Sequence, residues 1–167
     1  DVFCEKGYFS VIDCRKILET GMKYNLKPRL HADEFVDSGA AELAAEVGAV
    51  SADHLMAVSD SGINKMSEKG IVATLLPGTT LFLGKESYAD GRKMIDLGCE
   101  VALATDFNPG SCTIQSMPLI ISLANLYCGL TIKEAFKGAT WNGTKVLNLE
   151  GKIGAVCEGY SADLLFF

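Results

Sequence analysis

The sequence lacks the features that identify membrane proteins and nucleic-acid-binding proteins. No apolar run approaches the roughly 20 residues that a membrane-spanning helix needs. The 15 basic residues are outnumbered by 21 acidic ones, which gives a net charge of −6, and no block of lysine or arginine stands out. We therefore expect neither a membrane nor a nucleic acid as a partner. The first residues carry no signal-peptide pattern, so we expect a cytoplasmic protein.

Paired cysteines are also absent. Six cysteines occur, but none form a C-x-x-C pair, and most lie in apolar or helical surroundings. A zinc–thiolate site would need clustered pairs of cysteines. Because disulfides are rare in cytosolic proteins, we expect six reduced thiols that pack as small apolar groups.

What the chain does contain is a regular alternation of short apolar strands and helices over 167 residues. Such an alternation is typical of βα units with parallel strands, and so predicts an α/β fold. A closed eight-stranded barrel takes roughly 250 residues. The chain therefore holds either an open sheet or a partial TIM-like (β/α) barrel with about the last half of the strands. The partial barrel is favoured because the chain begins and ends within predicted strands. The predicted strands end at Cys4, His31, His54, Pro77 and Asp106, and the one that ends at Pro77 runs into a Pro-Gly turn.

Helices are expected between and after these strands. Ser10 with Asp13 resembles a capping box, and Thr131 with Glu134 forms one. Beyond residue 150 the composition changes, because a glycine-rich turn leads into a strand predicted at 163–167. We therefore predict a barrel segment over 1–150 and the beginning of a small β-sandwich domain over 151–167. The predicted helices span residues 10–25, 37–47, 60–68, 85–97, 113–128 and 131–147.

Three of the predicted strands end on side chains that bind metals. Two of these side chains, His31 and His54, are the only histidines of the sequence, and the third is Asp106. The carboxyl ends of parallel strands meet at one edge, where barrels and open sheets bind their ligands. Neutral imidazole and carboxylate form a normal ligand set for a divalent metal. Because His31 and Asp106 alone are too few for a catalytic metal site, further ligands must lie outside this stretch.

Residues beside these strand ends add acid–base and binding groups. Glu34 could orient a substrate or move a proton, and His54 could polarise or deprotonate a metal-bound water. Asn108, Gly110 and Ser111 lie in a loop before a predicted helix, where free backbone N–H groups suit a substrate carboxylate. Each residue also has a structural interpretation: a hydrogen-bonded core histidine, an acid at a helix N-terminus or a turn residue. Asp33 and Asp53, beside the histidines, are either supporting partners of the site or exposed turn residues.

Several runs of residues resemble the imidazolonepropionase family of the amidohydrolase superfamily. They are His-Ala-Asp-Glu-Phe at 31–35, Ser-Ala-Asp-His-Leu at 51–55, Leu-Leu-Pro-Gly at 75–78 and Ala-Thr-Asp-Phe-Asn-Pro-Gly-Ser at 104–111. That family hydrolyses a cyclic amide C–N bond of 4-imidazolone-5-propanoate to give N-formimidoyl-L-glutamate, a step of histidine degradation. It does so with one zinc or iron ion in a TIM-like barrel. The resemblance thus implies a metal-dependent hydrolase of a small molecule.

The resemblance also implies a role for each candidate residue. His31 and Asp106 would bind the metal, and Glu34 would contact the substrate ring. His54 would help to activate the water, and either His54 or Asp106 would pass a proton to the leaving nitrogen. Substrate or product would be held by Asn108, Gly110 and Ser111.

The sequence departs from that family in what it lacks. The family's His-x-His pair comes from the first barrel strand, and no such pair occurs here. The arginine and tyrosine that meet the propionate are absent as well. We therefore expect the segment to be inactive alone and to need the upstream remainder of the barrel as its partner; a homodimer is compatible with it. Two alternatives stay open: another amidohydrolase, deaminase or dihydroorotase-like, and a non-catalytic barrel fragment that acts as a binding module.

Overall fold

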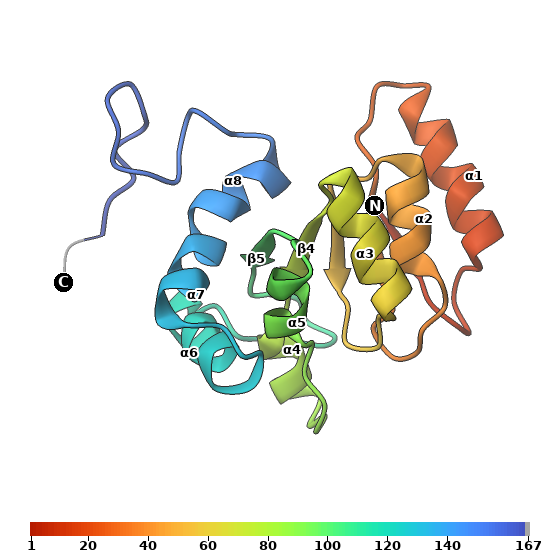
Figure 1. Ribbon diagram of the computed structural model, residues 1–167, viewed down its shortest axis with the longest axis horizontal. Helices are drawn as coiled ribbons and strands as arrows, with labels where there is room; N and C mark the ends of the chain where they lie inside the picture. Colours follow the sequence, from red (N-terminus) through yellow and green to blue (C-terminus); the bar gives the residue numbers. More distant parts are fainter. Residues whose placement is uncertain (166–167) are drawn as a thin grey trace.

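The computed structural model describes residues 1–165, and within them five strands form one parallel sheet (Figure 1). The strands lie side by side in chain order, so each connection is a crossover through helical segments. His31 pairs in register with Phe3 on one side and with Asp53 on the other. This arrangement confirms the predicted α/β class. The strands are β1 (Val2–Cys4), β2 (Arg29–Ala32), β3 (Ser51–His54), β4 (Val72–Leu75) and β5 (Val101–Leu103).

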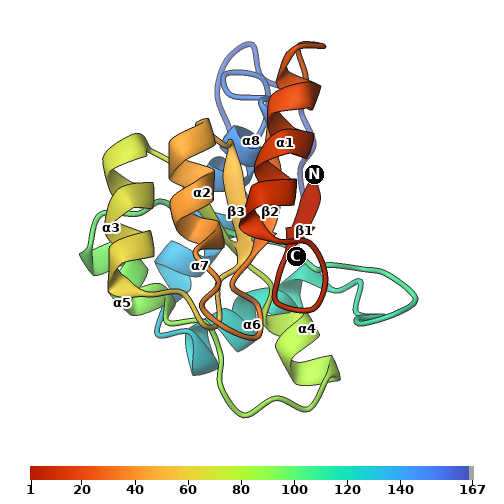
Figure 2. The same cartoon turned by 90° about the vertical axis from the view of Figure 1, so that its right-hand side faces the viewer.

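The helices pack beside one another along the sheet. Figures 1 and 2 show α1, α2 and α3 as neighbours over the first strands, while α6, α7 and α8 lie beyond β5. None of the helices in the described part of the chain combines the length and the apolarity that crossing a bilayer requires. The helices are α1 (Val11–Met22), α2 (Ala40–Val47), α3 (Asp60–Lys69), α4 (Pro77–Phe82), α5 (Gly91–Asp96), α6 (Met117–Tyr127), α7 (Ile132–Ala139) and α8 (Trp141–Leu147).

The two faces of the sheet differ in chemistry. Leu30, Ala52 and Ala73 are completely buried and belong to the main apolar core. The alternate positions His31 and Asp53 carry polar side chains on the other face, because successive residues of a strand point to opposite sides. A sheet with one face packed on helices and the other polar is suited to the wall of a barrel.

The cysteines belong mostly to the packed interior. All six are free thiols, and five of them are buried. Burial raises the pKa of the Cys4 and Cys128 thiols to about 12, so both stay protonated near neutral pH. They therefore behave as small apolar groups, as expected from the sequence.

Two predicted helices and one predicted turn need correction. The turn expected after β4 is a helix, because Pro77 stands at the first helical position, where its fixed backbone angle is favourable. The helix predicted over 85–97 begins only at Gly91, since the side chain of Asp90 caps the Lys93 N–H. The helix predicted over 131–147 is broken at Thr140, whose backbone (φ −124°, ψ −89°) is not helical.

The strand predicted at 163–167 is wrong over the residues that the structure describes. Residues 161–165 have no regular secondary structure, and the last two predicted strand residues lie outside the described range. A strand needs a partner, and none of the five described strands pairs with this segment. The division at residue 151 into a second domain stays a prediction.

Candidate active site

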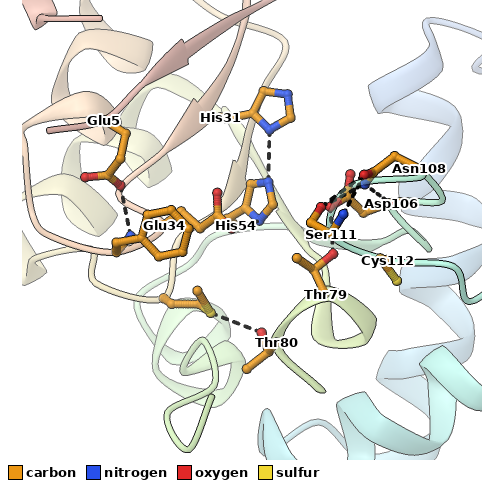
Figure 3. A network of polar contacts seen from close by, with 12 residues as sticks. Glu5, His31, Glu34, His54, Thr79, Thr80, Asp106, Asn108, Ser111 and Cys112 are labelled. Atoms are coloured by element: carbon orange, nitrogen blue, oxygen red, sulfur yellow. Dashed lines mark hydrogen bonds and ion pairs between the residues drawn. The ribbon is translucent and has the colours of Figure 1, made fainter. Parts of the chain in front are cut away.

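The carboxyl ends of the strands open into a cleft of about 500 Å³. Six of the seven residues predicted to form a site line this cleft, and the seventh, Gly110, lies in the same loop as three of them. Figure 3 shows them on two sides, with the histidines facing the loop that carries Asp106. A second cavity of about 540 Å³ lies between β5 and α8 but contains none of the predicted residues. The cleft is lined by Phe3, Tyr8, His31, Glu34, Phe35, His54, Leu83, Asp106, Asn108 and Ser111.

The two histidines are directly hydrogen-bonded to each other. His31 Nδ1 lies 2.9 Å from His54 Nε2, and His54 Nδ1 lies 3.6 Å from Glu34 Oε1. His54 is 4% exposed, and burial together with the nearby His31 lowers its pKa to about 4, against the opposing charge of Asp106. His54 is therefore neutral near pH 7. A neutral imidazole has one donor and one acceptor nitrogen, which suits it to relay a proton between its neighbours.

Glu34 is a buried carboxyl that faces the same cleft. It is 6% exposed, and burial raises its pKa to about 7. The negative charges of Asp106 and Glu5 raise the pKa further, while His31 and Lys85 oppose that rise. A carboxyl with a pKa near 7 can both take up and release a proton at neutral pH. Shifts of this kind in a cleft are typical of functional groups.

Buried carboxylates hold the loop that carries Glu34. Glu5, 2% exposed, accepts hydrogen bonds from the backbone N–H groups of Lys6 (2.8 Å) and Phe35 (2.9 Å). Asp33 is completely buried and caps α2, because it accepts from the N–H groups of Ser38, Ala40 and Ala41. Glu34 therefore projects from a segment that is tied down on both sides.

Asp106 projects from the loop after β5. Its Oδ2 accepts a hydrogen bond of 2.6 Å from the hydroxyl of Thr79, which lies in the first turn of α4. Asn108 organises the rest of this loop, since its Oδ1 accepts from the N–H groups of Gly110 and Ser111 at 2.8 Å each. Those two amides are thus not free for a substrate carboxylate, and that part of the sequence-based prediction is wrong. The Asn108 side chain and the Ser111 hydroxyl still line the cleft.

The backbone is strained at the strand ends that form the cleft. His54 has φ +77°, Asp106 has φ +53°, and Asp33, next to Glu34, has φ +48°. Left-handed backbone at residues other than glycine costs on the order of 1–3 kcal/mol each and is concentrated in active sites and ligand clamps. Left-handed backbone recurs at the ends of β2, β3 and β5. The positions of these side chains are therefore kept although they lower the stability of the fold.

The chemistry of the donors fits a metal, although the set is incomplete. A histidine that binds a metal commonly donates its other N–H to a partner. His31 Nδ1 has such a partner in His54, while Nε2 lies 3.1 Å from Asp1 Oδ2. Asp106 Oδ1 receives no hydrogen bond from the described residues. Within residues 1–165, only Asp33, Asp37 and Glu42 bring three ligand atoms within 4.8 Å of one another. Asp33 there already caps a helix. The assignment of His31 and Asp106 as two ligands of a larger set stays a prediction.

Comparison with known proteins identifies the family. The Amidohydrolase family model matches residues 40–167. The chain belongs to the amidohydrolase family. It is 54% identical over 165 residues to an imidazolonepropionase of Bacteroides fragilis. The aligned residues make up 99% of this chain and 39% of that protein. It is 52% identical over 167 residues to the imidazolonepropionase of Geobacillus sp. (strain WCH70), again over 39% of that protein. The chain thus spans about two fifths of the length of these curated relatives.

A solved structure shares the fold. An adenosine deaminase from Xanthomonas campestris with bound zinc superposes with a TM-score of 0.76 at 17% identity, over 93% of this chain and 40% of that one. At this identity the likeness concerns the fold alone. Together with the family match, it confirms the partial α/β barrel and the resemblance noted from the sequence.

Two residues of the site were missed in the sequence. Glu5 directly follows β1, at the same edge of the sheet as the other site residues, and this position could have singled it out. Thr79 follows the Pro-Gly pair after β4, where a turn rather than a helix was predicted. Asp33 was noted as a supporting residue or an exposed turn residue, and the structure makes it the buried cap of α2.

Proposed function

We propose that this chain is the carboxyl-terminal part of an imidazolonepropionase. Such an enzyme hydrolyses a cyclic amide C–N bond of 4-imidazolone-5-propanoate to N-formimidoyl-L-glutamate in histidine degradation. One observation carries the proposal: a chain about half identical to imidazolonepropionases over its whole length forms a cleft that gathers His31, Glu34, His54 and Asp106. A cytoplasmic location and a homodimer are further parts of it.

In this proposal, His31 and Asp106 hold one divalent metal ion, zinc or iron. The remaining ligands come from an upstream segment, because the curated relatives are more than twice as long as this chain. When bound, the metal supplies a Lewis acid that polarises the substrate and lowers the pKa of a water. His31 would bind the metal through Nε2, which lies 3.1 Å from Asp1 Oδ2 in the structure. Its Nδ1–H would then donate to His54, which would fix the tautomer and the orientation of the ring.

Proton movement is assigned to the side chains around the cleft. Either Asp106 or His54 takes the proton from the attacking water and delivers it to the leaving ring nitrogen. Glu34 contacts the substrate ring, and with a pKa of about 7 it can accept or donate a hydrogen bond to a ring nitrogen. Because His54 Nδ1 lies 3.6 Å from Glu34 Oε1, this pair can share one proton as the substrate changes charge.

The loop after β5 holds the substrate through side chains. Asn108 and the Ser111 hydroxyl offer polar atoms to the cleft. Gly110 contributes by close packing, because a Cβ there would lie 3.3 Å from Asn108 Oδ1. This loop therefore binds polar groups of the substrate or product with a geometry that Asn108 sets in advance.

The test uses the full-length polypeptide, including the proposed upstream segment. We expect it to hydrolyse 4-imidazolone-5-propanoate, to contain stoichiometric metal, and to lose turnover when His31→Ala is introduced. Turnover of a purine or of dihydroorotate without turnover of the imidazolone would instead identify a deaminase or a dihydroorotase-like enzyme. Substoichiometric metal, with His31→Ala without effect, would identify a non-catalytic binding module.

A further inference from the structure

Thr79 lies directly behind the carboxylate of Asp106. It occupies the first turn of α4, which begins as soon as β4 ends, and it is 1% exposed. Its Oγ1 donates to Asp106 Oδ2 over 2.6 Å (Figure 3). A hydroxyl that donates to an ionised carboxylate over this distance makes a strong hydrogen bond. The contact joins two neighbouring strand ends at the side chain that is proposed to bind the metal.

Close packing fixes the position of this hydroxyl. A Cβ placed on Gly78 would lie 2.7 Å from Ile120 Cδ1 and 3.3 Å from Cys112 Sγ. The start of α4 is therefore pressed against α6 and against the loop that follows Asp106. Asp106 is itself held in left-handed backbone. Thr79 therefore cannot shift without disturbing packed neighbours.

The hydrogen bond also distinguishes the two carboxylate oxygens. The torsion that orients a carboxylate is broad and roughly two-fold, so an unrestrained Asp106 would present either oxygen. With Oδ2 engaged by Thr79, Oδ1 is the oxygen left without a hydrogen-bond donor among the described residues. On the basis of the proposed function, we propose that Thr79 is a positioning residue that orients Asp106 so that Oδ1 binds the divalent metal through one oxygen.

A purely structural role is the rival explanation. In that case the hydrogen bond satisfies a buried hydroxyl, and its loss lowers stability without changing metal affinity. Thr79→Val separates the two roles because it keeps the shape of the side chain and removes the donor. Thr79→Ser keeps the donor and removes only a methyl group. Thr80→Val is the matched control, because Thr80 is equally buried but its hydroxyl contacts Met56 Sδ instead of Asp106.

The experiment measures zinc affinity of the full-length polypeptide by competition with a chelator, together with thermal unfolding of the metal-free protein. We expect Thr79→Val to weaken zinc binding about 10- to 100-fold, the usual effect of losing a partner that orients a ligand. Thr79→Ser should restore most of the affinity, and Thr80→Val should keep it. If Thr79→Val does not fold, Thr79→Ala provides the same comparison.

Unchanged zinc affinity in Thr79→Val, or equal losses in the Val and Ser variants, would overturn the inference. So would a loss confined to the unfolding temperature of the metal-free protein. These outcomes differ from a failure of the proposed function. Turnover of the imidazolone with zinc affinity insensitive to Thr79 refutes the positioning role alone. Zinc affinity that depends on the Thr79 hydroxyl, without imidazolone turnover, refutes the proposed reaction alone.

Discussion

The two loops that carry carboxylates into the cleft are held by opposite kinds of chemistry. The loop of Glu34 is tied down by buried carboxylates, Glu5 and Asp33, which accept hydrogen bonds from backbone N–H groups. Asp106 and its loop are held instead by neutral groups, the hydroxyl of Thr79 and the amide of Asn108. The first arrangement adds negative charge near Glu34 and the second adds hydrogen-bond donors near Asp106. Under the proposed function, this difference suits Glu34 to share a proton with His54 and Asp106 to bind the metal.

The largest expected difference between the two loops follows from replacing each carboxylate by its amide. Asp106→Asn removes a proposed metal ligand and should weaken zinc binding by more than the roughly 100-fold that loss of an outer partner costs. Glu34→Gln should leave zinc affinity near that of the wild type and abolish most turnover. Chelator competition and steady-state kinetics on the full-length polypeptide check both. Equal loss of zinc affinity in the two variants would show that the loops do not differ in role.

The strand order and the edge that carries the site could be predicted from the sequence. His31 and His54 lie at the carboxyl ends of β2 and β3, Asp106 lies in the loop after β5, and parallel strands bring these ends together. The supports of these residues could not be predicted, because they depend on pairs distant in sequence. Glu5 contacts Phe35, and Thr79 contacts Asp106, across 30 and 27 residues respectively.

The local errors have local physical causes. Free amides after Asp106 were expected from the turn-like sequence alone, but Asn108 turns its own side chain back onto them. Asp33 looked like a turn residue because it follows a strand, yet it caps a helix that begins seven residues later. Both errors arise because a short polar side chain can satisfy nearby backbone groups in several ways.

The second prediction concerns the raised pKa of Glu34 and its effect on stability. A carboxyl whose pKa rises from 4.5 in the unfolded chain to about 7 in the folded one stabilises the fold most below pH 4.5. That contribution is lost as the pH rises through 7. Glu34→Gln cannot ionise, so it should gain stability relative to the wild type as the pH rises from 5 to 8, by about 1–3 kcal/mol. Denaturant unfolding across this range measures the difference.

His54 affects the same stability measurement with the opposite dependence on pH. Its folded pKa of about 4 lies below the unfolded value of 6.5, so its contribution is present above pH 6.5 and is lost as the pH falls through 4. The Glu34→Gln variant retains His54 and should therefore show the same loss of stability as the pH falls through 4. A Glu34→Gln stability profile that runs parallel to the wild type between pH 5 and 8 would contradict the assigned pKa of Glu34.

The smallest expected effect tests whether Glu5 supports only one of the two loops. Glu5 accepts two backbone N–H groups with its two oxygens, and glutamine has only one acceptor oxygen. Glu5→Gln therefore leaves one buried N–H without an acceptor and should destabilise the protein by about 1–3 kcal/mol. Burial is the main cause of the raised pKa of Glu34, and the negative charge of Glu5 adds to it. Because Glu5→Gln removes that charge, the pKa of Glu34 should fall.

Zinc affinity should stay unchanged in Glu5→Gln, because Asp106 is held by Thr79 and Asn108 rather than by Glu5. Glu68→Gln, at an exposed glutamate on α3, is the matched control and should alter neither stability nor the pH–rate profile. The decisive measurement is the lower-pH limb of the pH–rate profile. In Glu5→Gln this limb should shift to lower pH, because the pKa of Glu34 falls. A loss of zinc affinity without a movement of that limb would mean that Glu5 supports the metal side of the cleft, and the division between the two loops would then be wrong.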